Sequence, residues 1–193
     1  MAAADRPYVL GAANGVVTRD AVSRRWTPAC GVTSRRKDSL KKLPMSRANH
    51  PNAAVSTERV FSACPREVFA AFEQPDKLAQ WWGPKDFTNT FERFEFKPGG
   101  RWVFVMHGPN GANYPNESVF REIQPDTRIV IEHVVKPWYK LTVTLTARGE
   151  RTHLAWVQEF ENPEVAAKMR LLSGTANEQV LDRLQALLAR ENS

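Results

Sequence analysis

The sequence predicts an α+β domain in which one long helix covers a curved antiparallel sheet of about seven strands. Three observations favour this class. Short stretches of alternating apolar and polar residues, separated by turn residues, fill most of residues 56–161, as in an antiparallel meander. Two short helix-like stretches interrupt the strands near the beginning. A long stretch after residue 162 has apolar residues at every third or fourth position, which is typical of an amphipathic helix.

The first strand is expected at residues 56–63, and a short helix follows it. Pro65 suits the first turn of a helix. Behind it, Val68, Phe69 and Phe72 recur at helical spacing. The domain therefore begins with a strand and a helix of about three turns.

A second short helix is expected from Pro75 to a pair of adjacent tryptophans, Trp81 and Trp82. Gly83 and Pro84 end this helix. Neighbouring residues on a helix point about 100° apart, so the two rings face different surroundings. We expect Trp81 to anchor the helix against the sheet and Trp82 to border a cavity. The alternative is that both rings are core, since Trp is highly buried on average.

Six further strands complete the expected sheet, and each alternates apolar with polar residues. They are predicted at residues 89–97, 101–107, 117–123, 127–135, 138–148 and 151–161, with a loop at 108–116. A curved sheet with one apolar face needs a cover. Because one helix cannot fill a strongly curved sheet along its whole length, a cavity between the two is expected.

The final stretch predicts a helix of about seven turns that begins near Pro163 and supplies this cover. Its apolar positions are Val165, Met169, Leu172, Ala176, Val180, Leu184, Leu187 and Leu188. Gly174 lies inside the pattern, where a glycine indicates a bend or a close approach to the sheet.

Charge divides the chain into two regions. Residues 1–54 contain ten Lys or Arg and three Asp or Glu, whereas residues 55–193 contain seventeen and eighteen. The first region has no sustained period and is interpreted as a disordered basic tail. A targeting peptide, a nucleic-acid or membrane tether, and translated upstream sequence with a natural start at Met45 all explain it. The near-neutral folded domain is not expected to bind nucleic acid.

The remaining composition indicates a cytoplasmic protein without a transmembrane segment. No run of 18 apolar residues occurs. The two cysteines, Cys30 and Cys64, lie in different regions and form neither a disulfide framework nor a zinc pattern. A homodimer is compatible with the sequence.

Several stretches together resemble the SRPBCC superfamily, which has the START/Bet v 1-like helix-grip fold. Within it they resemble the group related to the C-terminal domain of the Hsp90 ATPase activator Aha1. The matching stretches are "RVFSACPREVFAAFEQPDKLAQWWGP", "FEFKPGGRWVFVMHGPNGANYPNESVFREI", "TRIVIEHV" and "NEQVLDRLQALL". They span about residues 57–190 in the order of the family. The resemblance implies the helix-grip fold. Members of the family bind apolar or amphipathic small molecules, a few catalyse reactions on them, and some act on Hsp90.

Candidate ligand-binding residues combine an apolar lining with a few polar groups. The set is Trp82, Trp102, Phe104, Met106, Tyr114, Glu117, Phe120, His133, Trp156 and Met169. The two-residue period of a strand puts alternate members on one face. His133 shares a face with Ile129 and Ile131 in this way. A closed core, with each polar group satisfied, is the alternative.

No catalytic residue, metal ligand or cofactor is assigned from the sequence. The three histidines of the strands, His107, His133 and His153, fall on different strands, and no phosphate-binding, dinucleotide-binding or zinc-protease motif occurs. We expect a binder of a hydrophobic or amphipathic molecule. One alternative is a cyclase or hydrolase that uses His133 or Glu117. The other is a co-chaperone-like module, although residues 1–54 are not expected to replace the separate Hsp90-binding domain of Aha1.

Overall fold

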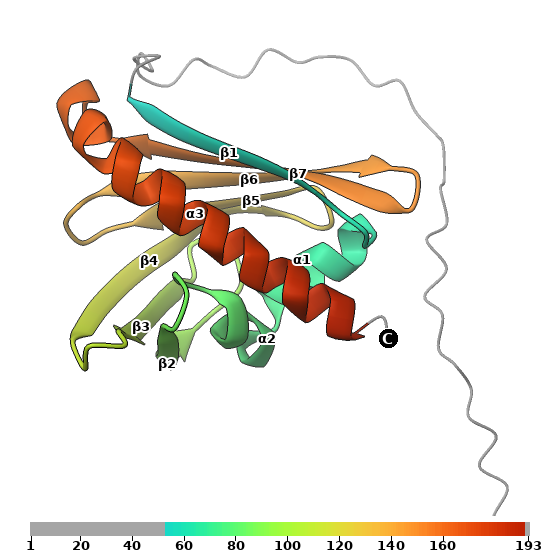
Figure 1. Ribbon diagram of the computed structural model, residues 1–193, viewed down its shortest axis with the longest axis horizontal. Coiled ribbons are helices and arrows are strands. Elements are labelled where there is room, and N and C mark those ends of the chain that lie inside the picture. The colour runs from blue at the N-terminus through green and yellow to red at the C-terminus, as the bar shows by residue number, and fades with distance from the viewer. Residues whose placement is uncertain (1–52, 192–193) are drawn as a thin grey trace, which may run out of the picture.

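The computed structural model describes residues 53–191 (Figure 1). The predicted basic tail, residues 1–54, lies outside the described residues except for its last two. The first strand begins at Ala54, two residues earlier than expected.

The described chain is an α+β domain with one seven-stranded sheet, as predicted. Every neighbouring pair of strands is antiparallel, and the strand order is β1-β7-β6-β5-β4-β3-β2. The elements are β1 (Ala54–Phe61), α1 (Pro65–Glu73), α2 (Pro75–Trp81), β2 (Thr88–Phe94), β3 (Arg101–His107), β4 (Asn113–Gln124), β5 (Arg128–His133), β6 (Tyr139–Arg148), β7 (Arg151–Phe160) and α3 (Pro163–Glu191). Strands β1 and β2 are the two edges of the sheet.

The largest boundary difference from the sequence prediction is at β4, which begins at Asn113, inside the stretch expected to be a loop. Pro115 pairs with Val105 of β3. A proline is tolerated in a strand where its other side has no ladder. The pairing of β4 with β5 reaches only to Ser118, so β4 can begin before the proline without losing a bond to β5.

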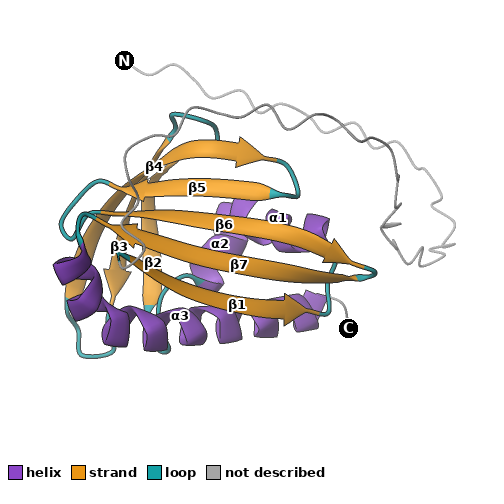
Figure 2. Cartoon of the chain, turned by 90° about the horizontal axis from the view of Figure 1, so that it is seen from above, coloured by secondary structure: helices purple, strands orange, loops and turns teal. Residues whose placement is uncertain are grey.

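Helix α3 runs along the concave face of the sheet and ends near α1 and α2 (Figures 1 and 2). Its second half buries Val180, Leu181, Leu184, Leu187 and Leu188. These side chains pack with the inward-facing residues of the sheet and of both short helices as the main core.

The first half of α3 departs from the predicted apolar face. Leu172, expected to face the sheet, is 67% exposed, while the polar residues Ser173 and Asn177 are buried. Ser173, Asn177 and Val180 follow helical spacing, and Leu172 points about 100° away from Ser173. A Cβ on Gly174 meets nothing within 4 Å, so this glycine makes no close approach to the sheet.

A second, smaller apolar cluster lies under the start of α3. It consists of Val55, Phe160 and Ala166, with Met169 packed against it. Along β7, Gln158 separates Phe160 of this cluster from Trp156 of the main core. The concave face therefore has two apolar regions with polar side chains between them.

Candidate functional site

The centre of the concave face is a group of tryptophan rings around Trp82. The Trp82 ring follows the last residue of α2 and is 7% exposed. Its centroid lies 4.8 Å from that of Trp102 on β3 and 5.5 Å from that of Trp156 on β7. We call Trp82, Trp102 and Trp156 the tryptophan cluster.

The adjacent ring, Trp81, has a different role. It is fully buried, and its Nε1 donates a hydrogen bond to the carbonyl oxygen of Ala71 at 3.0 Å. It also makes an edge contact with Phe72 of α1 at 4.8 Å. Trp81 therefore joins α2 to α1, and Trp82 joins α2 to the sheet.

Two members of the tryptophan cluster carry a buried donor that no atom of the described residues accepts. Within residues 53–191, Nε1 of Trp102 and Nε1 of Trp156 have no hydrogen-bond partner. A buried donor left unpaired costs about 1–3 kcal/mol, and such groups are uncommon in folded proteins. Both rings contact Trp82, so the two unpaired N–H groups belong to rings on the same part of the concave face.

Polar side chains lie beside this cluster, beneath the first half of α3. The side-chain amide Nδ2 of Asn177 donates to Oε1 of Gln158 at 2.8 Å, and both residues are buried. This bond joins α3 to β7. Ser173, one helical turn before Asn177, is buried as well.

His133 lies at the end of β5, on the same face as Ile129 and Ile131 as predicted. Its Nδ1 is 2.9 Å from the carbonyl oxygen of Pro137, and its Nε2 is 3.0 Å from Oδ1 of Asn116. Its ring stacks on Tyr139 at 4.6 Å. Burial lowers the pKa of His133, while the bond to Pro137 opposes that shift.

Burial also acts on Tyr139, whose pKa it raises to about 12. A neutral phenol at physiological pH fits its place between His133 and Phe160, whose ring centroids lie 4.6 Å and 6.0 Å away. The buried His133 and the partly buried Tyr139 therefore form a stacked polar pair.

The structure brings together most of the residues that the sequence selected. Phe104 stacks on Trp102 at 4.3 Å, and Phe120 is buried beside the same ring. Met106 packs partly buried against the main core, and Met169 against the smaller cluster. Their assignment to ligand binding stays a prediction.

Two selected residues lie elsewhere. Tyr114 is exposed, and its ring contacts Phe87 at 5.9 Å. Glu117 pairs with Val103 across the β3–β4 ladder, on the opposite face from the adjacent Asn116–Phe104 pair. Its carboxylate accepts hydrogen bonds from Arg101 at 3.0 and 2.6 Å.

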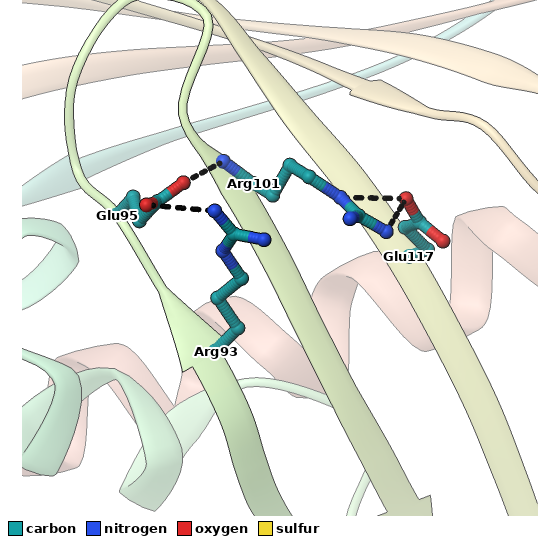
Figure 3. Close-up of polar contacts among 4 residues, drawn as sticks. All are labelled: Arg93, Glu95, Arg101 and Glu117. Carbon is teal, nitrogen blue, oxygen red and sulfur yellow. Dashed lines mark hydrogen bonds and ion pairs between the residues drawn. The ribbon is translucent and has the colours of Figure 1, made fainter.

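Glu117 belongs to a chain of charged groups on the outer face of the sheet (Figure 3). Arg93 donates to Glu95 at 3.0 Å, and the backbone N–H of Arg101 donates to the same carboxylate at 3.1 Å. These bonds lower the pKa of Glu95. Because Glu117 and His133 face opposite sides of the sheet, they cannot act together as an acid and a base on one ligand.

Sequence reasoning missed several polar residues of the concave face. They are Asn116, Ser118, Gln158, Ser173 and Asn177. The two-residue period from Phe120 reaches Ser118 and Asn116, and from Trp156 it reaches Gln158. The strand period therefore placed these residues on the inner face, but a polar residue type does not by itself indicate that the side chain is buried.

Two kinds of feature are not found in the described part of the chain. Among residues 53–191 no three His, Cys, Asp or Glu side chains lie close enough to hold a metal ion. No helix of the same region is long and apolar enough to cross a membrane.

Comparisons with solved structures support the fold. A protein from Arthrobacter aurescens is 25% identical with a TM-score of 0.67, and the match covers 72% of this chain and 87% of that one. A protein from Nitrosomonas europaea is 19% identical with a TM-score of 0.69, covering 74% and 97%. An AHSA1-like protein from Aeromonas hydrophila is 19% identical with a TM-score of 0.60, covering 72% and 94%.

The family comparison agrees with the resemblance seen in the sequence. No curated protein matches the chain. The sequence pattern of the family described as Activator of Hsp90 ATPase homolog 1-like protein matches residues 62–189. This range extends from the end of β1 almost to the end of α3, so it includes every residue of the tryptophan cluster. The chain therefore belongs to the Activator of Hsp90 ATPase homolog 1-like family.

Proposed function

We propose that the protein binds an apolar or amphipathic small molecule between the concave face of the sheet and α3. The observation that carries this proposal is the pair of unpaired indole N–H groups, on Trp102 and Trp156. A core evolved only for packing gains nothing from two buried donors without acceptors. An acceptor on a bound molecule gives these donors a partner.

The surroundings of the two donors agree with an amphipathic ligand. The three rings of the tryptophan cluster are large apolar groups that are buried in the main core. The bonded amides of Gln158 and Asn177 lie next along the same face. Ligand sites generally combine an apolar lining with a few placed polar groups. The half-buried side chain of Met106, close to Gly83, adds an adaptable apolar group.

A binding role without chemistry fits the polar residues better than catalysis does. Both ring nitrogens of His133 lie at hydrogen-bond distance from protein oxygen atoms. Glu117, the other candidate acid or base, is bound to Arg101 on the outer face. Neither residue offers a free group to a ligand on the concave face.

The test is a titration of the full chain with a dansyl-labelled fatty acid, followed by dansyl fluorescence. Trp102→Phe and Trp156→Phe keep an aromatic ring and remove the unpaired donor. Each should weaken binding by roughly tenfold, which corresponds to about 1.4 kcal/mol, because the acceptor on the probe loses its partner.

The matched control is Trp81→Phe. It removes an indole N–H that is already bonded to Ala71, so it should lower stability and leave probe affinity within about twofold. If all three variants bind the probe equally well, or if the wild type does not bind it, the proposal is wrong. Native mass spectrometry of freshly purified protein adds a direct search for a co-purified small molecule.

A further inference from the structure

A groove of about 480 Å³ lies between α2 and the edge strand β2. Two of its lining residues, Phe91 and Phe94, also contact the Trp102 ring of the tryptophan cluster, at 5.4 and 5.9 Å. One wall is formed by Pro75, Asp76 and Ala79 of α2, and the other by residues 89–94 of β2. Figure 1 shows α2 beside β2 at the end of the sheet opposite to β1. No other element of the described chain lines it.

The lining residues show that the groove follows the edge of β2. Side chains of a strand alternate between two faces, so a groove on one face is lined by every second residue. Here six consecutive residues, 89–94, line the groove. A bulge between Phe91 and Arg93 interrupts the alternation, but the consecutive lining residues extend on both sides of it, and within residues 53–191 β2 pairs with β3 alone. The groove therefore exposes the unpaired edge of the sheet.

The other edge of the sheet differs. Strand β1 lies beside α3 (Figure 2), and Arg59 of β1 forms ion pairs with Glu178 and Asp182 of that helix at 2.5 Å each. An open edge strand is a template for pairing with another chain. Strand β2 has a groove along its edge, bridged at one end by Asn89, whose side-chain amide donates to the carbonyls of Ala79 and Trp82.

The charges in the groove are unbalanced. Asp76 and Glu92 are exposed carboxylates that form no ion pair with another described residue, whereas the guanidinium of Arg93 is bound to Glu95 at 3.0 Å. Phe91 and Phe94 are half-buried and stack at 5.8 Å, which gives the groove an apolar floor. The unpaired charges of the groove, on Asp76 and Glu92, are therefore negative, and they lie beside an aromatic surface.

We propose that this groove binds an extended peptide segment of another protein, which adds to β2 as a further strand. Main-chain hydrogen bonds to the open edge supply affinity, and side chains that alternate along the peptide supply specificity. Basic side chains of the peptide pair with Asp76 and Glu92, and apolar ones cover Phe91 and Phe94. Because Asn89 already bonds the carbonyl of Ala79 at 3.1 Å, the added strand pairs with β2 beyond Asn89.

The probe is an acetylated and amidated octapeptide of alternating lysine and valine, labelled with fluorescein and titrated with the full chain. Fluorescence anisotropy should show saturable binding that weakens as salt is added. A second peptide of the same sequence carries N-methyl groups at alternate residues, which removes backbone donors without changing the side chains. It should bind at least about tenfold more weakly, because a tenfold change corresponds to the loss of roughly one good hydrogen bond.

Variants of the chain test the assigned walls. The pair Asp76→Lys with Glu92→Lys should weaken peptide binding by about tenfold or more, since two attractions become repulsions. Ala79→Trp should block the groove by its size. The charge-matched control is Glu150→Lys with Glu161→Lys, which should change affinity less than about twofold. These two exposed residues lie directly before and directly after β7. Melting temperatures of all variants show whether each one folds.

Three outcomes overturn the proposal. Equal affinity for the plain and N-methylated peptides excludes strand addition, and absence of saturable binding excludes the peptide class. The third concerns the basic residues of the chain's own first region, which include Arg35, Arg36 and Lys37. If replacing these residues with glutamine raises peptide affinity about tenfold, that segment competes for the groove, and the assignment to another protein is wrong.

Discussion

The guanidinium of Arg183 on α3 donates a hydrogen bond to the carbonyl oxygen of Gly83 at 3.0 Å. The same side chain donates to the carbonyls of Pro84 at 2.8 Å and Gln80 at 2.7 Å. A cation bonded to the last carbonyls of a helix is a favourable helix end. Through Arg183, α3 therefore holds the segment from which the Trp82 ring projects.

Removing this guanidinium should destabilise the fold. We expect Arg183→Met to lower the free energy of unfolding by about 2 kcal/mol, because several carbonyl oxygens lose a charged donor. Arg183→Lys should cost roughly half as much, since a lysine keeps the charge but not the planar fork. The measurement is urea denaturation followed by circular dichroism.

Arg190 provides the control for this prediction. It lies on the same helix, and its bond to the Gln80 side chain is 3.5 Å long and exposed. Arg190→Met should therefore change stability by less than about 0.5 kcal/mol. A loss for Arg183→Met no larger than that for Arg190→Met would show that the guanidinium does not hold α2.

Replacing each of two glycines with alanine should change the free energy of unfolding in opposite directions. Gly83 has φ +97°, a conformation that L residues rarely adopt, so Gly83→Ala should destabilise by about 1–2 kcal/mol. The new methyl also meets the flexible end of Met106 at 2.8 Å. Gly174 lies inside α3 with open space around it, so Gly174→Ala should stabilise by up to about 1 kcal/mol. The measurement is the melting temperature of each variant. A shift in the same direction for both variants would contradict this argument.

The fold was readable from the sequence because its elements have clear periods and stops. Pro65 and Pro75 begin the two short helices as expected, and the order of strands is that of the predicted meander. The start of β4 was missed because Pro115 and its neighbours read as a loop. Only the ladder shows that β5 does not reach that part of β4.

The site was less readable because burial is decided by tertiary packing. Because Leu172 is apolar, it was expected on the side of α3 that faces the sheet, but Ser173 and Asn177 are the buried residues there. Asn177 is acceptable there because Gln158, far away in sequence, accepts its hydrogen bond. Glu117 was placed by its neighbourhood in the sequence, whereas the pairing with Val103 assigns it to the outer face.

The burial of His133 should make stability depend on pH. Desolvation lowers its pKa in the folded protein below the ordinary 6.5. The unfolded chain therefore binds the proton more readily, and the stability contributed by the neutral ring is complete above about pH 7. It should decrease as the pH falls through 6.5 towards the folded pKa.

The measurement is the urea midpoint at several pH values from 7.5 to 5, for the wild type and for His133→Gln. Glutamine keeps a polar group but does not titrate, so the variant should show a smaller decrease over this window. The oxygen of Asn116, which faces Nε2 at 3.0 Å, partly compensates a charged ring and limits the size of the effect. An identical pH dependence in both proteins would show that His133 is not its source.

The adjacent tryptophans should separate stability from binding. Trp81 is fully buried and bonded to Ala71, so Trp81→Ala should cost about 4–5 kcal/mol, near the upper end for a core aromatic residue. Trp82 contacts Trp102 and Trp156, whose indole N–H groups have no partner within residues 53–191. Trp82→Ala should cost about 3 kcal/mol and should weaken binding of the dansyl-labelled fatty acid more than Trp81→Ala does, provided that both variants are compared where they remain folded.

The two residues share one helix end and one backbone context, so each is the control for the other. Denaturant midpoints and probe titrations measured side by side decide the outcome. Equal destabilisation with no selective loss of probe affinity in Trp82→Ala would mean that both rings are core, and the binding proposal would then rest on the indole donors alone.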